Sequence, residues 1–439
     1  MRKAHLLFVS LPLLFFSQQN SLPQDSLAAS TVLAPSASPP LINARPQVQT
    51  YWYGWARTEY SYDSRELAYA REYQLNLFPL DFKADLNGED IHAAGSSNYL
   101  SITSRVGVRA VGPKIWGAKS SANLEADFFG NTELNRSTSG TGSTGLLRLR
   151  QANLTLEWPS TRLLVGQSWY PSYVPDVSPG VASFNGGILF NPFGWATQLR
   201  LSQKLSSHLS VHITAYKDRE FQAPVVEGAS SNSATYNSLL PTFSTQLQYQ
   251  EQQLLVGVGA ELQNLQPVKE SRGYKSSEKL HSPMFYGYLR YQAPHLTLKT
   301  YALKGENLHH LVMLGGIASY RQLEGPDRYQ GTKTSAVWMD ASMPVKKTVP
   351  GVFLGYSHQG GTDPGYAELY LRGGSTTRIL TDLYRASARV EIKEHSFLLV
   401  PEIEYTVGSW EDTTENATGA GDAFHAGSLR LMARVMYSF

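Results

Sequence analysis

The chain has 439 residues, of which 42% are hydrophobic and 17% charged, and its formal net charge is +2. This balance is too polar for a bundle of membrane helices and too poor in charge for a soluble enzyme, whereas 36 glycines and 25 tyrosines suit many half-buried strands. A net charge near zero gives no reason to expect a nucleic-acid partner, and the lack of cysteine excludes disulfides, thiolate metal sites and an acylated N-terminal cysteine.

The first segment in chain order has the pattern of a secretory signal peptide. A basic head precedes an apolar run from Leu6 to Phe16, which is shorter than the ~20 residues of a membrane-spanning helix. We place the signal peptide at residues 1–23, and its cleavage point stays open between Ser17 and Ser30 because no A-x-A site stands out. Residues 24–46 are rich in Ser, Pro, Ala and Gln and are predicted to form a flexible periplasmic tail.

From residue 47 to the end, apolar and polar residues alternate with a period of two. This period belongs to strands that have one face in each of two environments, and no run of ~18 apolar residues is left for a helical span. The final strand shows the alternation most clearly. One of its faces carries Leu429, Leu431, Ala433, Val435, Tyr437 and Phe439.

The connections between the predicted strands alternate between short and long. The short ones lie near 112–117, 159–160, 206–207, 251–253, 294–295, 346–347 and 393–395. The long ones lie at about 63–97, 131–145, 170–193, 222–240, 266–281, 306–333, 361–383 and 410–426. Short turns at one end and long loops at the other are typical of transmembrane barrels.

The sequence therefore predicts an all-β fold, a transmembrane antiparallel up-and-down β-barrel over residues 47–439. Seven short turns join seven strand pairs, and one further strand at each end makes about sixteen strands, with short periplasmic turns and long extracellular loops. Residues 71–83 could be an additional strand, but the expectation of an even number of strands favours placing them in the first long loop.

If the apolar faces contact lipid, the polar faces point inward, into a barrel too wide for side chains to fill. Charged residues there are expected to line water and to tune which ions pass. The candidates for the pore lining and constriction are Arg105, Arg109, Glu125, Asp127, Arg148, Arg150, Arg200, Arg385, Arg389, Arg430 and Arg434. Their basic excess predicts a mild preference for anions, and the alternative is that most of these charges pair with one another across strands.

The third long loop, 170–193, is rich in Pro and aromatic residues and is expected to fold into the lumen as a constriction; packing between subunits is the alternative. Its candidate residues are Tyr173, Asp176, Phe184 and Asn185. The preceding strand, 146–158, changes phase, and a β-bulge near Arg150–Gln151 would reconcile its two halves. The upper part of that strand could instead rise above the membrane, where no alternation is needed.

Catalytic patterns are weak. His208 and His212 have a spacing that could chelate a metal on a strand, but no third ligand lies near in sequence, so polar wall residues are the simpler interpretation. The G-x-S-x-G and H-E-x-x-H motifs do not occur. We therefore expect no enzyme activity, no metal and no cofactor. Two alternatives stay open: an outer-membrane hydrolase with its catalytic set at the barrel mouth, and an adhesin or assembly barrel without channel activity.

Four segments resemble the DcaP-like trimeric porins and related porin-like proteins. They are SRVGVRAVGPKIWGAKSSANLEADFFG (104–130), LLRLRQANLTLEW (146–158), LLVGQSWYP (163–171) and FNPFGWATQLRLSQKL (190–205). The resemblance implies a sixteen-stranded homotrimer in the bacterial outer membrane that passes small, often anionic solutes such as dicarboxylates. It would place Arg148 and Arg150 near the lumen and the 170–193 loop inside it. The expected partners are thus small hydrophilic solutes, outer-membrane lipid and further copies of the chain.

Overall fold

The computed structural model describes residues 48–70, 75–130, 145–184, 186–219, 223–226, 229, 233–375, 377–412 and 423–439. Residues 46–439 form one compact unit. The predicted signal peptide (1–23) and periplasmic tail (24–46) lie outside the described residues and stay predictions.

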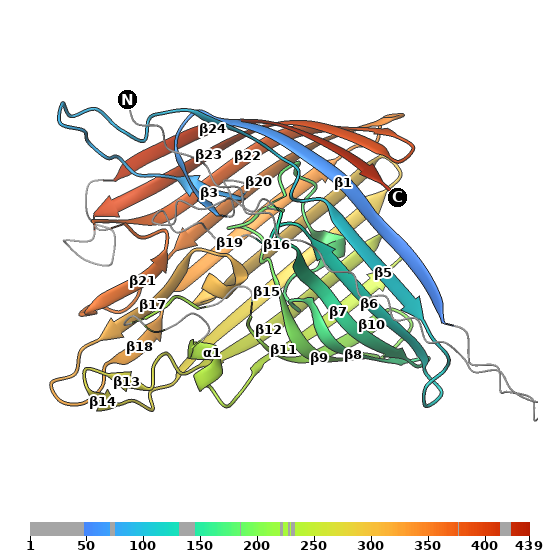
Figure 1. The fold of residues 1–439 in the computed structure, drawn as a ribbon, viewed down its shortest axis with the longest axis horizontal. Coiled ribbons are helices and arrows are strands. Elements are labelled where there is room, and N and C mark those ends of the chain that lie inside the picture. The colour runs from blue at the N-terminus through green and yellow to red at the C-terminus, as the bar shows by residue number, and fades with distance from the viewer. Residues whose placement is uncertain are drawn as a thin grey trace, which may run out of the picture. The chain divides into compact units, whose positions relative to one another are not determined.

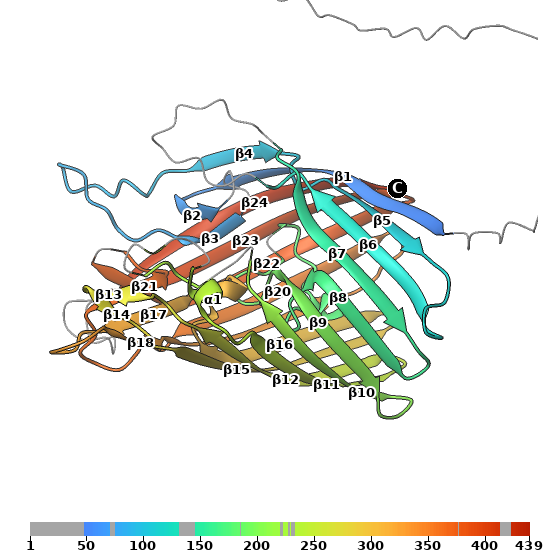
Figure 2. The same cartoon turned by 60° about the horizontal axis from the view of Figure 1, so that its bottom comes forward.

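The strands form a closed antiparallel barrel, drawn from two directions in Figures 1 and 2. In order around the ring, the strands are β1 (Gln49–Asp63), β5 (Arg105–Val111), β6 (Lys119–Asp127), β7 (Arg148–Glu157), β8 (Thr161–Trp169), β9 (Trp195–Lys204), β10 (Leu209–Lys217), β11 (Thr242–Glu251), β12 (Leu254–Leu265), β15 (Leu280–Ala293), β16 (Leu296–Glu306), β19 (Lys333–Ser342), β20 (Thr348–Gln359), β22 (Arg378–Glu394), β23 (Phe397–Asp412) and β24 (Phe424–Ser438). Pairing of β24 with β1 closes the ring. β4 (Ser96–Leu100) continues β5 and pairs with the other half of β1, so the two short strands count as one. The predicted number of sixteen strands is confirmed.

The turns and loops also fall where the alternation placed them. Each predicted short turn joins neighbouring strands, as 158–160 does between β7 and β8.

Three of the long connections matter below, and we name them loop 1 (64–95), loop 3 (170–194) and loop 6 (307–332). In loop 1, β2 (Leu67–Ala70) pairs with β3 (Leu75–Pro79) in a small sheet apart from the barrel, so segment 71–83 adds no strand to the ring.

Minor elements lie in the long loops. They are η1 (Pro175–Val177), α1 (Ser233–Asn237), β13 (Glu270–Ser271), β14 (Tyr274–Lys275), η2 (Leu308–Leu311), β17 (Gly315–Tyr320), β18 (Arg328–Gly331) and β21 (Glu368–Arg372). Among the described residues, no helix is long and apolar enough to cross a membrane.

The two faces of the barrel wall differ as predicted. Outward side chains are apolar and open, with Ile403 49% and Leu431 43% exposed, whereas the inward Arg385 and Arg430 are 3% and 2% exposed. An exposed apolar side chain gains free energy, by about 25 cal/mol per Å² of its surface, when it leaves water. This outer face is therefore suited to hydrocarbon.

The predicted β-bulge in β7 is confirmed. Glu125 of β6 pairs with Gln151, and the next residue, Ala126, pairs with Leu149, so Arg150 is the extra residue. Because of the bulge, Gln151 is buried together with Arg148 and Arg150. With strict alternation, Gln151 would point to the opposite face of the wall from the two arginines.

Candidate channel interior

Loops fill the half of the lumen next to the long connections. One apolar cluster joins inward side chains of the wall to side chains of loops 1, 3 and 6. Its members include Leu75 and Phe78 of loop 1, Phe184, Phe190 and Phe193 of loop 3, Leu311 and Met313 of loop 6, and Tyr301, Trp338 and Phe353 of the wall. The lumen is therefore narrowed by packed loops, and the predicted insertion of loop 3 is seen.

Five of the predicted charged residues meet where loop 3 leaves the wall. Asp127 accepts hydrogen bonds from Arg148 (Nε to Oδ1, 3.0 Å) and from Arg150 (Nη1 to Oδ2, 2.7 Å). Glu125 lies 3.1 Å from Nη1 of Arg105. Both β7 guanidinium groups also lie over the Trp195 ring, 4.7 and 4.3 Å from its centroid. The cluster is thus held by charge-assisted hydrogen bonds and aromatic contact.

Four more predicted residues lie on β22 and β24. Arg389 and Asp340 form a bidentate pair at 2.8 and 3.0 Å. Arg385 lies 3.3 Å from Glu404, and Arg430 lies 3.5 Å from Asp63. Arg434 donates to main-chain oxygens of loop 3. Nine of the predicted charged residues therefore form two groups, one on β5, β6 and β7 and the other on β22 and β24, and β1 lies between the two groups in the ring.

The expectation that all these charges line water does not hold in this half of the barrel. Asp127 and Arg150 are 0% exposed and Arg389 is 4% exposed, because inserted loops cover them. Alternation along a strand predicts whether a side chain points into or out of the barrel. It carries no information on whether a loop covers that side chain.

The other half of the lumen is open. Arg109 is exposed and Arg200 half-buried. A hollow of about 760 Å³ lies on the inner wall there, with Tyr51, Tyr53, Arg109, Asn123, Asn153 and Arg162 among its lining residues. We call this open half the vestibule.

The candidate residues of loop 3 have different surroundings. Tyr173 packs against Trp169 with ring centroids 4.5 Å apart and the ring planes tilted by 32°, and Phe184 packs edge-on against Phe129. Asp176 is exposed and lies 3.7 Å from Arg290. Asn185 lies outside the described residues.

Aromatic residues of the inner wall are a feature that the sequence analysis missed. The rings of Tyr286, Tyr301 and Trp338 lie nearly parallel, with centroids 5.8 and 6.3 Å apart. A Cβ at Gly259 would lie 2.2 Å from the Tyr286 ring, so the glycine gives the ring room to lie against the wall. The sequence signal that could have indicated it is the pair of tyrosines at 286 and 288 in β15 together with the pair of glycines at 257 and 259 in β12.

Histidine contacts bear on the hydrolase alternative. His212 lies 2.7 Å from the Ser202 hydroxyl and His425 lies 3.0 Å from that of Ser409, but neither shows a contact with a carboxylate within the described part of the chain. His310 approaches Glu261 at 3.4 Å, but both are 2% exposed, which leaves no room for a substrate. His358 lies 2.9 Å from Asp382, and these two side chains are partly exposed. No group of three metal-ligating side chains occurs among the described residues.

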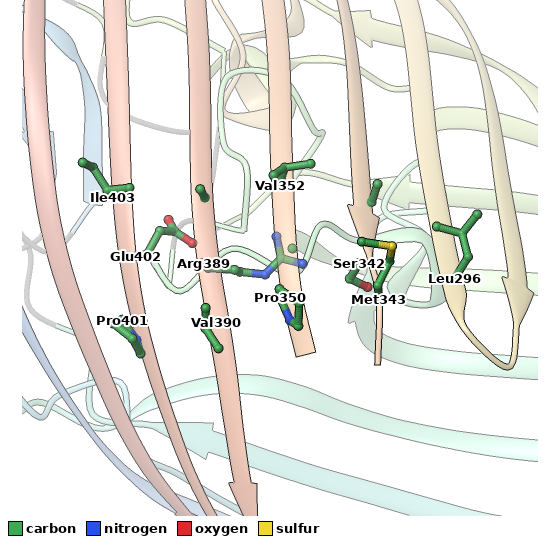
Figure 3. A pocket seen from close by; sticks show the side chains of 13 residues that line it. Leu296, Ser342, Met343, Pro350, Val352, Arg389, Val390, Pro401, Glu402 and Ile403 are labelled. Atoms are coloured by element: carbon green, nitrogen blue, oxygen red, sulfur yellow. The ribbon is translucent and has the colours of Figure 1, made fainter. Parts of the chain in front are cut away.

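A depression of about 650 Å³ lies on the outer wall and not in the lumen (Figure 3). Its outward lining consists of apolar side chains such as Val352, Val390 and Ile403. The small residues Ala341 and Ala388 are also among its lining residues. It belongs to the apolar exterior, so it has no part in a passage through the barrel.

The sequence matches no family model and no curated protein, whereas the fold matches solved structures. The outer membrane channel DcaP of Acinetobacter baumannii is 16% identical, over 89% of this chain and 97% of that one, with a TM-score of 0.61. OmpF of Salmonella typhi is 11% identical over 91% and 99%, and a loop-deleted OmpT of Vibrio cholerae is 12% identical over 89% and 99%, both with a TM-score of 0.50. At these identities the likeness establishes the fold.

Proposed function

We propose that this chain, which has the fold of the bacterial outer-membrane porins, is a porin that lets small hydrophilic solutes diffuse passively and mildly prefers anions. The observation that carries the proposal is a closed barrel with an apolar exterior and a polar, charged interior. An assembly or adhesin barrel has no need of an open, charged vestibule.

The anion preference is supported by the charges of the vestibule and its edge. Among the inward, at least partly exposed side chains that the structure describes there, the basic ones outnumber the acidic ones. The basic residues are Arg109, Arg162, Arg200, Lys204, Arg290, Lys299 and Arg434, and the acidic ones are Glu157, Asp176 and Glu391. Like-charged groups around an aqueous passage attract counter-ions and exclude ions of their own sign.

Planar-bilayer recording tests both parts of the proposal. The purified protein should give discrete conductance steps, and in a potassium chloride gradient the reversal potential should have the sign of chloride selectivity. Replacing Arg109 and Arg162 together by glutamine should move the reversal potential toward zero, because both side chains lie in the vestibule hollow. Lys114, in the 112–118 turn, supplies the control substitution Lys114→Gln, which should leave the potential unchanged.

Persistent electrical silence of a correctly folded protein would contradict the porin proposal. Cation selectivity would contradict only the preference for anions. The proposal includes a homotrimer, which sedimentation of the detergent-solubilised protein would check.

A further inference from the structure

The outer wall has a second depression, apart from the one in Figure 3. It extends over β11, β12, β15 and β16, which are neighbours in the ring (Figure 1), and its volume is about 680 Å³. Most of the outward side chains that line it are apolar, such as Leu247, Val258 and Phe285. The exceptions are Thr245 and one charged residue, Lys304. We call this depression the outer groove.

We propose that the outer groove binds an acyl chain of an outer-leaflet lipid whose headgroup carries phosphate, and that Lys304 pairs with this phosphate. The proposal concerns the outside of the barrel, so it does not depend on conduction. It rests on the predicted orientation, in which the long loops face the outer leaflet.

Lys304 is a lone charge on this part of the wall. Its neighbours across the strands are Phe285 of β15 and Ser335 of β19, and no ion pair within the described part of the chain includes it. Glu306, the next outward residue of β16, interacts with Lys333 instead. A lysine on the outer face is unfavourable in hydrocarbon but is tolerated near the membrane interface. Lys304 lies two positions from the long-loop end of β16, where a lipid phosphate would supply the missing counter-charge.

Basic residues gather at the same end of these strands. The connection 266–279 joins β12 to β15, the two middle strands of the outer groove, and its basic side chains outnumber its acidic ones. The basic residues are Lys269, Arg272, Lys275 and Lys279, and the acidic ones are Glu270 and Glu278. Arg272 lies 3.5 Å from Asp327 of loop 6, and the exposed His281 follows at the start of β15. This charge favours an anionic headgroup above the groove.

Gly287 leaves part of the outer groove empty. It lies on the outer face of β15, and a Cβ there would meet its nearest atoms, the Gly257 oxygen and Cγ1 of Val258, at 3.7 and 3.8 Å, which is ordinary contact. The fold therefore does not require glycine at this position, whereas Gly257 and Gly259 make room for tyrosine rings on the inner face. A glycine inside a strand weakens the strand and often marks the close approach of a ligand.

The apolar surface continues past the end of β11. Phe243 and, toward the loop, Leu240 and Leu239 are all exposed. Contiguous exposed apolar surface marks a contact with membrane or protein. A phosphate-bearing lipid brings both an apolar chain for the groove and an anionic group for Lys304, which the apolar wall of a second copy would not.

Native mass spectrometry of the detergent-solubilised chain tests the proposal, with lipid A as the probe. Lipid A is a disaccharide lipid that carries phosphate groups and several acyl chains, and the same lipid without phosphate is the reference. The unmodified chain should bind the phosphorylated probe at least about fivefold more tightly, since one lysine beside an anionic lipid group adds a factor of that size.

Two substitutions address the two parts of the site. Lys304→Gln should weaken binding of the phosphorylated probe about fivefold and leave binding of the phosphate-free one unchanged. Gly287→Leu fills the groove and should weaken binding of both probes by at least about tenfold, because displaced methylene groups lose their burial.

Matched controls lie elsewhere on the ring. Lys83→Gln removes an exposed lysine of loop 1, and Ala122→Leu adds the same bulk to the outer face of β6. Neither should alter binding of either probe. A heat-dependent gel shift establishes folding of each variant.

Each part of the proposal can fail by itself. If the unmodified chain binds both probes equally, or if Lys304→Gln binds the phosphorylated probe like the unmodified chain, the pairing with phosphate is wrong. If Gly287→Leu binds no more weakly than Ala122→Leu, the groove is not the site.

Sedimentation of the same proteins tests the other occupant. If Gly287→Leu changes the number of copies per particle and Ala122→Leu does not, the groove is a contact between copies and the lipid site is refuted. The conductance of every variant should equal that of the unmodified chain, so failure of the lipid site leaves the porin function standing.

Discussion

Asp127 of β6 accepts hydrogen bonds from Arg148 and Arg150 of β7, and each of the three residues is at most 6% exposed. Taking a carboxylate away from buried guanidinium groups leaves charge without compensation. Such a loss typically destabilises a protein by about 3–5 kcal/mol. Glu125, 3.4 Å from Nε of Arg150, offers only partial replacement.

We therefore expect Asp127→Ala to lower the free energy of unfolding by about 3 kcal/mol or more. Urea titration of the barrel in lipid vesicles, followed by tryptophan fluorescence, measures it. Asp176→Ala is the control, because the Asp176 side chain is 67% exposed and its removal should change stability by no more than about 0.5 kcal/mol. Equal effects of the two substitutions would refute the importance of the cluster.

His310 of loop 6 is a second residue whose role depends on its neighbours. Burial disfavours its charged form, but the carboxylates of Asp218 and Glu261 outweigh burial and raise the pKa of His310 above its ordinary value of 6.5. The Tyr216 hydroxyl lies 3.3 Å from Nε2 of His310, and the Tyr170 ring packs edge-on against the imidazole.

A histidine with a raised pKa adds stability that is complete below its ordinary pKa and is lost as pH rises through the raised value. From pH 6.5 upward, the stability of the unmodified chain should therefore fall relative to that of His310→Gln, which has no charge to lose. Urea titrations at a series of pH values measure the difference. Parallel curves for the two proteins would contradict the role given to His310.

At the scale of elements, β3 shows how a loop strand can look like a strand of the barrel. Residues 71–83 have enough apolar character for a membrane strand, and in the structure the apolar side chains of β3 lie inside the lumen. Phe78 packs on Trp410 of β23 with ring centroids 5.6 Å apart, and the indole Nε1 of Trp410 donates to the Pro79 oxygen. The expected even number of strands placed the segment in loop 1, but no sequence pattern indicated that it would pack against β23.

Removing the Phe78 ring should therefore free loop 1 without opening the barrel. Large-to-small changes of buried aromatic residues remove about 3–5 kcal/mol, which is enough to detach a short hairpin. Phe78→Ala should be cut by trypsin at the exposed Lys83 faster than the unmodified chain. Leu323→Ala, at a fully exposed side chain of loop 6, is the control and should be cut at the unmodified rate.

The whole molecule depends on a wall with opposite environments on its two faces. Ile213 and His212 are adjacent in β10, and the first is 56% exposed on the outer face whereas the second contacts Ser202 on the inner one. Arginine on the lipid face of a barrel is unfavourable by about 2–4 kcal/mol near the bilayer centre, while inner positions tolerate charge.

Ile213→Arg should accordingly reduce the stability of the barrel in vesicles by about 2 kcal/mol or more, and His212→Arg by less. The same urea titration compares them. A larger loss for His212→Arg would mean that the outer face does not meet lipid.

The sequence by itself determined the ring: strand number, turn positions, the bulge at Arg150 and the direction of each side chain. These follow from a two-residue period and from the turns between strands, which are local properties of the chain. Only the tertiary structure decided the state of the lumen, because residues from loops 1, 3 and 6 meet there with strands hundreds of positions away. Arg150 is covered and Arg109 is exposed because of that long-range packing, which alternation within a strand does not predict.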